Sequence, residues 1–308
     1  MKIFGDYHIH SEFSRDAKVS QVTKTKPTVE DIVKRAKELE LQEVAITDHG
    51  PAAYVGAKLK NFPHRKAMCE RAERDHGIKV FCGVEANVMG TKGQIDVPAE
   101  MRKNLDILLC GIHVRVWGGF GYLFKFFLPN MFWRTIRWAP KGRIAKNTQV
   151  MKNAIEHNDI DVWTHPNLYF KLDVVEVART CTERGTLIEL NGSRISFRPV
   201  DFERMIALGA KFIINSDAHM VEKVGRIDRV KEFLKYCEYK DEDIINLSGL
   251  YRRPETKLLV KLREELEAFD ECGLEHATEK EICVHDKKIE KQKEKERKRR
   301  EKMIKKKG

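Results

Sequence analysis

The stretch Ile3-Phe4-Gly5-Asp6-Tyr7-His8-Ile9-His10 begins the chain with a short β-type run that ends in two histidines. A strand turns residues i and i+2 toward the same face, so the imidazoles of His8 and His10 can point into one site. A single His-x-His pair is weak support for a metal site. Its meaning depends on whether the other predicted strands end in the same way.

Short β-type runs alternate with helix-type runs from residue 3 to about residue 236, which is typical of a parallel sheet or barrel built from βα units. Strands are predicted near residues 3–8, 43–48, 79–86, 106–112, 160–164, 186–190 and 211–216. Helices are predicted near residues 28–40, 62–76, 143–157, 173–184, 199–208 and 225–236. Thr28 is the predicted N-cap of the first helix, and Gly185 and Gly209 are predicted to end two later ones. Seven strands predict an α/β fold of the (β/α)7 barrel type, one unit short of the usual eight.

Metal-binding residue types stand at the ends of these predicted strands. They are His8, His10, His49, Glu85, His113, His165, Asp217 and His219. The chemistry of a parallel barrel lies at the carboxyl ends of its strands, so these side chains are expected to converge on one rim. Imidazole and carboxylate ligands suit Zn, Mn or Fe, and we expect two or three divalent ions. Glu85 is the natural bridge between ions, because a carboxylate can offer one oxygen to each of two cations. Clustered ions of this kind suit phosphoester hydrolysis.

The order of the strand-end motifs resembles the PHP (polymerase and histidinol phosphatase) family, and especially its small stand-alone bacterial phosphoesterases. The motifs are His8-x-His10, Thr47-Asp48-His49-Gly50, Gly83-x-Glu85-Ala86-Asn87, Gly111-Ile112-His113, Thr164-His165-Pro166, Glu189-Leu190-Asn191 and Ser216-Asp217-Ala218-His219. The resemblance covers about residues 3–250 and implies a distorted (β/α)7 barrel of the PHP type with a three-metal site. It implies that the first ion binds His8, His10, Glu85 and Asp217, the second Glu85, His113 and His165, and the third His49 and His219.

The third ion needs one more ligand, from the loop after the first strand. Where the nearest relatives carry a histidine, the same spacing in this chain falls on Asp16. A carboxylate still binds metal and prefers harder ions such as Mn, so we expect Asp16 to complete a differently loaded third site. We predict Glu85, Asp217 and His219 as the catalytic residues.

Two further groups of polar residues are expected to support the site. Those expected to orient imidazoles, or to hold water and ligand carboxylates, are Asp6, Asp48, Asn87 and Asn191. Arginines of the rim loops, whose guanidinium groups fit phosphate oxygens, are Arg15, Arg115 and Arg194.

The basic balance of the chain comes from its C-terminal end. The formal net charge is +11, but residues 287–308 hold 13 Lys/Arg against 4 Glu, which leaves only +2 for the rest. Charge therefore does not make the folded part a nucleic-acid binder. Seven cysteines without a Cys-x-x-Cys pair, and no apolar leader or membrane-length apolar run, predict a cytoplasmic protein with no transmembrane segment.

Composition predicts two domains. Residues 1–254 are expected to form the catalytic barrel, with an insertion over 117–140 that holds nine of the 26 aromatic residues. This insertion is a lid, a subunit-pairing patch, an interfacial lipid contact, or a long loop folded back as local core. Residues 255–308 are expected to be a Lys/Glu-rich tail, helical or disordered, able to contact nucleic acid or another acidic surface.

We predict a metal-dependent phosphoesterase that hydrolyses small phosphomonoesters by attack of a metal-bound hydroxide. One alternative is a nuclease or phosphodiesterase that acts on nucleic-acid ends, with the tail holding the polymer. Another is a non-catalytic binding or scaffold protein that metal stabilises. Amidohydrolase barrels also begin with His-x-His, but this chain has Glu85 and His49 at the third and second strand ends. It also has no Lys at the fourth strand end to act as a carbamate bridge.

Overall fold

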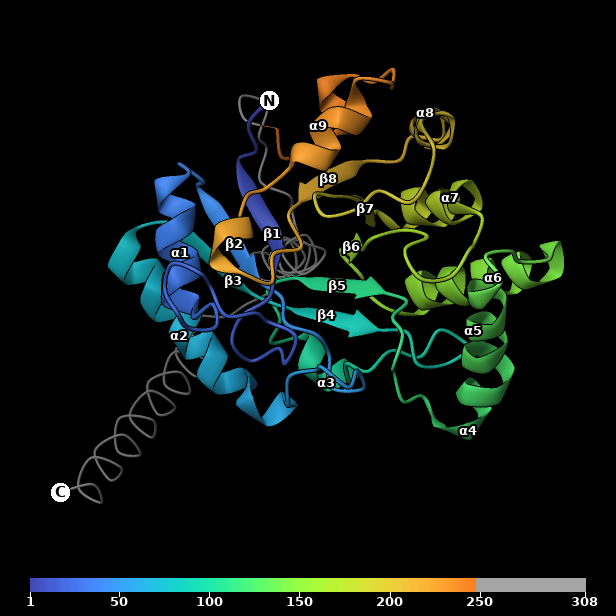
Figure 1. The fold of residues 1–308 in the computed structure, drawn as a ribbon, viewed down its shortest axis with the longest axis horizontal. Coiled ribbons are helices and arrows are strands. Elements are labelled where there is room, and N and C mark those ends of the chain that lie inside the picture. Colours follow the sequence, from blue (N-terminus) through green and yellow to red (C-terminus); the bar gives the residue numbers. More distant parts are fainter. Residues whose placement is uncertain (248–308) are drawn as a thin grey trace, which may run out of the picture. The chain divides into compact units, whose positions relative to one another are not determined.

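The computed structural model describes residues 1–247, which form helices packed around parallel strands (Figure 1). The strands are β1 (Gly5–Ile9), β2 (Glu43–Ile46), β3 (Lys79–Cys82), β4 (Val84–Asn87), β5 (Leu108–Gly111), β6 (Val162–Trp163), β7 (Leu187–Asn191) and β8 (Phe212–Asn215). The helices that alternate with them are α1 (Val29–Glu38), α2 (Phe62–His76), α6 (Lys141–His157), α7 (Val174–Arg184), α8 (Pro199–Ala207) and α9 (Asp228–Leu234). These are the six predicted helices. Shorter pieces are α3 (Ala99–Arg102), α4 (Gly119–Tyr122) and α5 (Leu128–Thr135), and the 3-10 turns η1 (Leu59–Asn61), η3 (Val221–Lys223) and η4 (Asp241–Asp243).

The strands form two parallel sheets. One has the order β1-β2-β3 and the other β4-β5-β6-β7-β8, so each strand pairs with its neighbour in the sequence. Two isolated parallel bridges link the sheets, Ile9 to Ala218 and His49 to Glu85. The predicted parallel α/β fold is thereby confirmed, and the parallel strands deliver their carboxyl ends to one side.

The predicted strand over residues 79–86 is two strands that belong to different sheets. Gly83 separates them, with its N–H donating to the carbonyl of Ile46 at 2.9 Å, while Val84 N–H donates to the carbonyl of Ile107 at 3.4 Å. The chain therefore changes its pairing partner from β2 to β5 at this residue. A Cβ at Gly83 would press against the carbonyl and Cγ2 of Ile107.

We expect Gly83→Ala to lower the free energy of unfolding by about 1–3 kcal/mol, because either the side chain of Ile107 or the strand pairing must shift. Urea unfolding measures the loss. The matched control is Gly142→Ala in α6, where the added methyl group meets nothing within 4 Å. This control is expected to be neutral or slightly stabilising, and equal effects of the two substitutions would contradict the prediction.

Local sequence explains where the main helices begin and end. Thr28 accepts a hydrogen bond from Asp31 N–H at 3.1 Å and donates its own N–H to the Asp31 carboxylate, a capping box that starts α1. Asp173 caps α7 in a similar way, through Val175 and Glu176. Gly185 and Gly209, with φ of 63° and 82°, adopt the left-handed conformation that follows a helix end.

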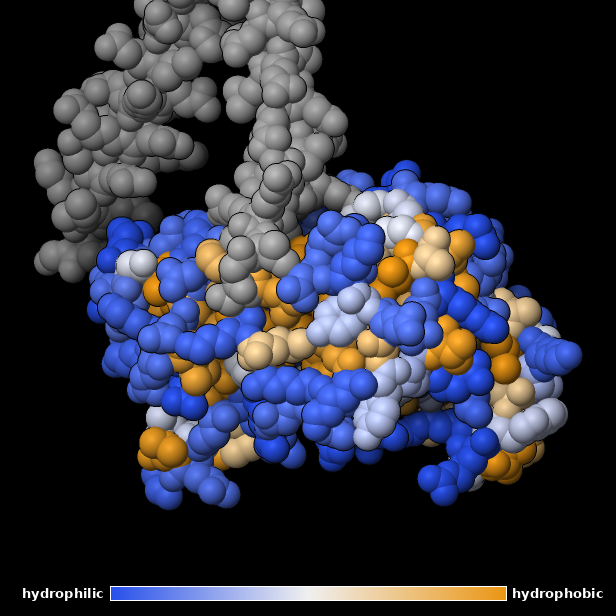
Figure 2. Space-filling model, turned by 90° about the horizontal axis from the view of Figure 1, so that it is seen from above, coloured by the Kyte–Doolittle hydropathy of each residue, from blue (hydrophilic) through white to orange (hydrophobic). Residues whose placement is uncertain are grey.

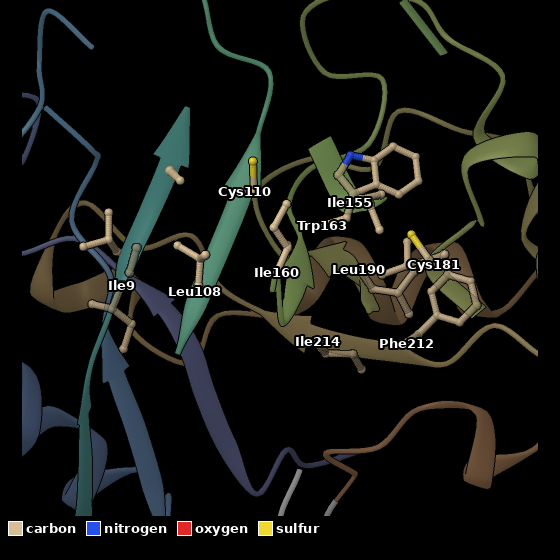
Figure 3. Packing of buried hydrophobic residues seen from close by; sticks show 14 of the residues in the cluster. Ile9, Leu108, Cys110, Ile155, Ile160, Trp163, Cys181, Leu190, Phe212 and Ile214 are labelled. Carbon is tan, nitrogen blue, oxygen red and sulfur yellow. The ribbon is translucent and has the colours of Figure 1, made fainter. Parts of the chain in front are cut away.

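Side chains alternate between two layers of core. One small cluster draws its side chains from strands of both sheets. It consists of Tyr7, Ala45, Phe81, Ile107, Leu109, Val162 and Ile213. Their strand neighbours face the helices and join a larger cluster, part of which is drawn in Figure 3: Ile9, Leu108, Cys110, Trp163, Leu190, Phe212 and Ile214. The period of two gives the strands an inner and an outer face, except in β1, where the register shifts between Asp6 and Ile9, and Tyr7 and Ile9 pack in different clusters.

Residues 117–140, here called the aromatic segment, are mostly helical and not a loop. The segment contains α4, a turn of π-helix η2 (Leu123–Phe127) and α5, one after another. No helix among the described residues is long and apolar enough to cross a bilayer. The predicted domain boundary at 254/255 and the predicted tail lie outside the described residues.

Candidate metal centre

All nine predicted metal ligands lie together at the carboxyl ends of the strands. They are His8, His10, Asp16, His49, Glu85, His113, His165, Asp217 and His219, joined by nitrogen–oxygen or nitrogen–nitrogen distances of 3.6 Å or less. Glu85 lies in β4, and most of the others follow a strand end directly. The side chains come from every part of the chain between residues 8 and 219, and the fold alone brings them into contact.

The first predicted set brings four possible ligand atoms close together. His8 Nε2 lies 3.1 Å from His10 Nε2, 3.3 Å from Glu85 Oε2 and 3.6 Å from Asp217 Oδ1. His10 Nε2 lies 3.6 Å from Glu85 Oε2 and 3.4 Å from Asp217 Oδ1. Ligand atoms about 2.0–2.2 Å from a tetrahedral zinc ion would lie about 3.3–3.6 Å from one another. The separations of 3.3–3.6 Å fall in this range, so these side chains are close enough to share one ion.

The second predicted set gathers around the other oxygen of Glu85. Glu85 Oε1 lies 3.0 Å from His113 Nε2 and 2.8 Å from His165 Nε2, and these two nitrogens are 3.0 Å apart. Thr164 donates its hydroxyl to the same oxygen at 3.0 Å. Glu85 thus presents one oxygen to each set, which is the geometry of a bridging carboxylate.

The third predicted set is built around Asp16. Asp16 Oδ2 lies 3.1 Å from His49 Nε2 and 3.3 Å from His219 Nε2. The ring of His10 stacks on that of His219 with centroids 4.1 Å apart. Nδ1 of His49 lies 2.8 Å from Glu85 Oε2, so this histidine also touches the first set. The Asp16 carboxylate is thus in position to serve as a ligand, as predicted.

Burial and neighbouring charges shift the pKa values of the imidazoles in two directions. Burial, together with His219 and His49, lowers the pKa of His10 to about 3, and burial lowers the pKa of His113 to about 4. Burial opposes protonation of His8 as well, but the carboxylates of Glu85, Glu189 and Asp217 outweigh it and raise the pKa of His8 well above 6.5. Burial thus favours the neutral form of His10 and His113, which can donate an electron pair, whereas the neighbouring carboxylates favour the protonated form of His8.

The side chains of the cluster leave several buried polar atoms without a hydrogen bond, as expected of a site that binds divalent cations. Oε2 of Glu85, Nδ1 of His49 and Oδ1 of Asp16 are buried and have no hydrogen-bond partner among the described residues. The Glu85 and His49 atoms lie 2.8 Å apart without the alignment of a hydrogen bond. Facing imidazole nitrogens and partnerless carboxylate oxygens are costly in a protein interior unless a cation lies between them.

Glu189 is a functional residue that the sequence interpretation missed. Its Oε1 lies 2.7 Å from Nδ1 of His8, and its Oε2 accepts hydrogen bonds from the backbone N–H of His165 and from Asn191. Asn191 also donates to Asp217 Oδ2 at 3.1 Å, as expected of an amide that holds a ligand carboxylate. A carboxylate behind a ligating histidine fixes its tautomer and orientation. Glu189 could have been found from the sequence, because it belongs to the strand-end motif Glu189-Leu190-Asn191.

We expect Glu189→Gln to weaken metal binding by about 10- to 100-fold, because a carboxamide cannot hold His8 Nδ1–H as a carboxylate does. Chelator competition on the purified protein measures the affinity, and circular dichroism checks the fold. Glu176→Gln on the outer helix α7 is the matched control and should leave the affinity unchanged. An unaltered affinity in Glu189→Gln would show that His8 needs no such support.

Asp6 and Asp48 have roles other than the one expected. Neither contacts an imidazole ring. Asp6 accepts hydrogen bonds from the backbone N–H groups of Ser216 and Gly225 and so ties β1 to the loop after β8. Asp48 accepts from the N–H and hydroxyl of Ser11, both at 2.7 Å, and fixes the loop that follows His10. Both aspartates therefore position the backbone beside the ligands.

Two of the predicted ligands have backbone angles that are uncommon outside glycine. His165 has φ of 28° and Asp217 has φ of 54°. Such conformations cost of order 1–3 kcal/mol each and concentrate at functional sites. They direct both side chains inward from turns that immediately follow β6 and β8.

A cavity of about 640 Å³ adjoins the cluster. It is lined by the aromatic segment and by the loops after β6 and β7, through Asn130, Trp133, Arg134, Thr135, Arg137, Trp138, Ala139, Asn167, Leu168, Tyr169, Phe170, Lys171 and Arg194. The ring of Tyr169 lies 5.8 Å from those of His113 and His165, and so connects the cavity to the cluster. Of the three predicted rim arginines, Arg194 lines the cavity, while Arg15 turns toward Tyr54.

Comparisons with known proteins show which proteins this chain resembles. A probable phosphatase of Caldanaerobacter subterraneus subsp. tengcongensis is 28% identical over 217 residues, which cover 68% of this chain and 76% of that protein. A probable phosphatase of Proteus mirabilis is 27% identical over 230 residues, which cover 72% of this chain and 84% of that protein. The histidinol phosphate phosphatase of Lactococcus lactis subsp. lactis, solved with zinc, L-histidinol and phosphate, has a similar fold. Its TM-score is 0.50 at 14% identity, over 82% of this chain and 99% of that one. The sequence profile of the PHP domain matches residues 6–192, more than half of the chain. The resemblance found in the strand-end motifs is thus confirmed, and the chain belongs to the PHP domain family.

Proposed function

We propose that this PHP enzyme is a divalent-metal-dependent phosphoesterase that acts on small phosphomonoesters. The observation that carries the proposal is Glu85, whose two oxygens face two separate groups of histidine nitrogens at 2.8–3.6 Å. Bridged divalent cations, when bound, supply a water of lowered pKa and positive charge for the phosphoryl oxygens. His8, His10, Glu85 and Asp217 would hold the first ion and Glu85, His113 and His165 the second, with Asp16, His49 and His219 around a third.

The open side of the cluster indicates where the substrate binds. The side chains of His219 and Asp217 are 24% and 15% exposed, while those of His8, His10 and Glu85 are fully buried. A phosphate arriving from solvent therefore meets His219 and Asp217, together with Asp16 at 31% exposure, before it meets the buried residues. This supports catalytic roles for His219 and Asp217, with the buried Glu85 between the ions.

The cavity supports a small anionic substrate. Its volume falls within the range of about 300–1,000 Å³ that is common for small-molecule sites. Arg134, Arg137, Lys171 and Arg194 line it, and none of these four side chains forms an ion pair within residues 1–247. Guanidinium groups without a carboxylate partner are suited to phosphate oxygens.

We also infer that the two sheets together form the distorted barrel expected of this family. The bridges Ile9–Ala218 and His49–Glu85, and the inner cluster shared by strands of both sheets, support it. Strands β3 and β4 would then occupy one position of a seven-position barrel. A catalytic domain over residues 1–254 belongs to the same proposal.

The test is a metal and substrate survey of the full chain purified without chelator. Elemental analysis is expected to find at least two divalent ions per chain, drawn from Zn, Mn and Fe. Phosphomonoesters should be hydrolysed faster than diesters or oligonucleotides, without the steep salt dependence of polymer binding. Arg137→Ala should raise KM about tenfold, whereas Arg184→Ala at the far end of α7 should not. Metal-loaded protein that hydrolyses no phosphoester would overturn the proposal.

A further inference from the structure

The aromatic segment carries a continuous apolar stripe on its outer face. Phe120, Phe124, Leu128, Phe132 and Ile136 recur every fourth residue and are between 45% and 71% exposed. Trp117 and Trp138 extend the exposed apolar surface at both ends. In Figure 2, apolar residues reach the surface at the right-hand end of the view, where Figure 1 draws α4, α5 and α6.

This exposure does not come from a poorly anchored segment. Tyr122, Phe126 and Asn130 are buried at the same spacing of four, two residues out of phase with the stripe. Two residues correspond to about 200° around a helix, so these side chains point to the opposite side. Phe126 packs on Tyr122 and Phe170, and Asn130 exchanges two hydrogen bonds of 2.8 Å with Asn147 of α6. The inner face of the segment is therefore held by packing and hydrogen bonds, while its outer face is apolar and exposed.

The charged side chains in and around the aromatic segment, counted along the sequence, all have one sign. Residues 107–155 contain eight Lys/Arg and no Asp or Glu. Of these eight, Lys152 alone forms an ion pair within the described residues, with Glu176. Lys125, Arg134 and Arg137 stand exposed between or beside the apolar side chains. Whatever covers this face therefore needs an apolar part and negative charge.

A second copy of the chain does not meet that requirement. A two-fold pairing places the same patch on both sides of the interface, so cations would face cations. An anionic phospholipid surface does meet it, because its headgroups match Lys and Arg while Trp, Phe and Leu enter the layer beneath them. Exposed aromatic side chains flanked by basic ones are typical of segments that lie in a membrane interface.

We propose that the outer face of the aromatic segment docks the enzyme onto anionic phospholipid surfaces. Phe120, Phe124, Leu128 and Phe132 enter the interfacial layer, and the neighbouring Lys and Arg side chains bind headgroup phosphates. Since Trp133 and Arg134 of the same segment line the cavity, docking brings the cavity close to the lipid. This surface goes beyond the proposed hydrolysis and does not depend on it.

Tryptophan fluorescence tests the proposal on the full chain. The chain has four tryptophans, three of them in the aromatic segment and the fourth, Trp163, buried in the core. Residues 287–308 contain none, so binding through the basic C-terminal end alone gives no tryptophan signal. Vesicles of phosphatidylglycerol and phosphatidylcholine with brominated acyl chains are expected to quench the fluorescence. Pure phosphatidylcholine vesicles should quench it far less.

Two substitutions on the stripe sharpen the test. Phe124→Ser and Phe132→Ser should each weaken binding to the anionic vesicles about tenfold or more, with hydrolysis of a soluble phosphomonoester unchanged. The matched control is Tyr236→Ser, an equally exposed aromatic residue outside the segment. Vesicle binding without quenching would assign the contact to the C-terminal end and overturn the proposal. So would the absence of vesicle binding, or a dimer in sedimentation that the serine variants dissociate.

Discussion

Replacing Glu85 with Gln is expected to remove at least two of the bound ions and to lower kcat/KM by about a thousandfold or more. The carboxylate is fully buried, and its two oxygens are shared by five histidines of the cluster: His8, His10, His49, His113 and His165. A carboxamide keeps the shape but carries no charge and offers one oxygen. Losing several kcal/mol of transition-state charge stabilisation corresponds to this factor.

Elemental analysis and steady-state kinetics on the same preparation measure the result. The matched control is Glu43→Gln, a buried carboxylate at the amino end of β2 that accepts the hydroxyl of Tyr7 at 3.0 Å. It lies at the opposite end of the strand from the site and should leave the metal content unchanged. A Glu85→Gln protein with its full complement of ions would show that Glu85 bridges nothing.

The proximity of the predicted ligands could be foreseen, because their positions follow from local rules. A residue at the end of a parallel strand must emerge on the active rim, so His113 and His165 were placed by their strands alone. The i, i+2 rule placed His8 beside His10, and the observed nitrogen–nitrogen distance of 3.1 Å agrees with it. Asp16 lies in a loop, where no strand or helix period indicates the direction of a side chain. Its prediction as a ligand rested on the family resemblance.

The supporting contacts could not be predicted, because they join residues with no relation in the sequence. Glu189 meets His8 from 181 positions away. The chain changes from one sheet to the other at Gly83, where a Cβ would meet the carbonyl and Cγ2 of Ile107, and strand propensity does not record such a close approach. The helices of the aromatic segment were not predicted, because both of its faces are apolar. A helix is recognised from its sequence when one face is apolar and the other is polar. Here Phe124 and Phe126 lie on opposite faces, so the apolar residues show no helical period.

Replacing Arg65 with Met is expected to lower the free energy of unfolding by about 3–5 kcal/mol, the largest effect on stability that the fold suggests. Arg65 is buried in α2, donates to Asp48 at 3.0 Å and to the carbonyl of Gly83 at 2.6 Å. Asp48 in turn holds Ser11, next to His10. The substitution leaves the Asp48 carboxylate buried without its cation, and it loosens the loop beside the metal cluster.

The pH dependence of this loss distinguishes an ion pair from simple packing. Burial alone would raise the pKa of Asp48, but Arg65 and the hydrogen bonds from Ser11 outweigh it and hold the pKa below 3.8. The pair therefore stabilises the folded state fully above that value, and its contribution is lost as the pH falls through the lower pKa. Urea unfolding of metal-free protein should show a difference between wild type and Arg65→Met that shrinks in acid.

The matched control is the neighbouring Lys66→Met, which breaks a partly exposed ion pair with Asp106. It should lower the free energy of unfolding by no more than about 1 kcal/mol. Adding Asp48→Asn to Arg65→Met should recover part of the stability, and a loss that is independent of pH and of Asp48 would mean that Arg65 acts through packing alone.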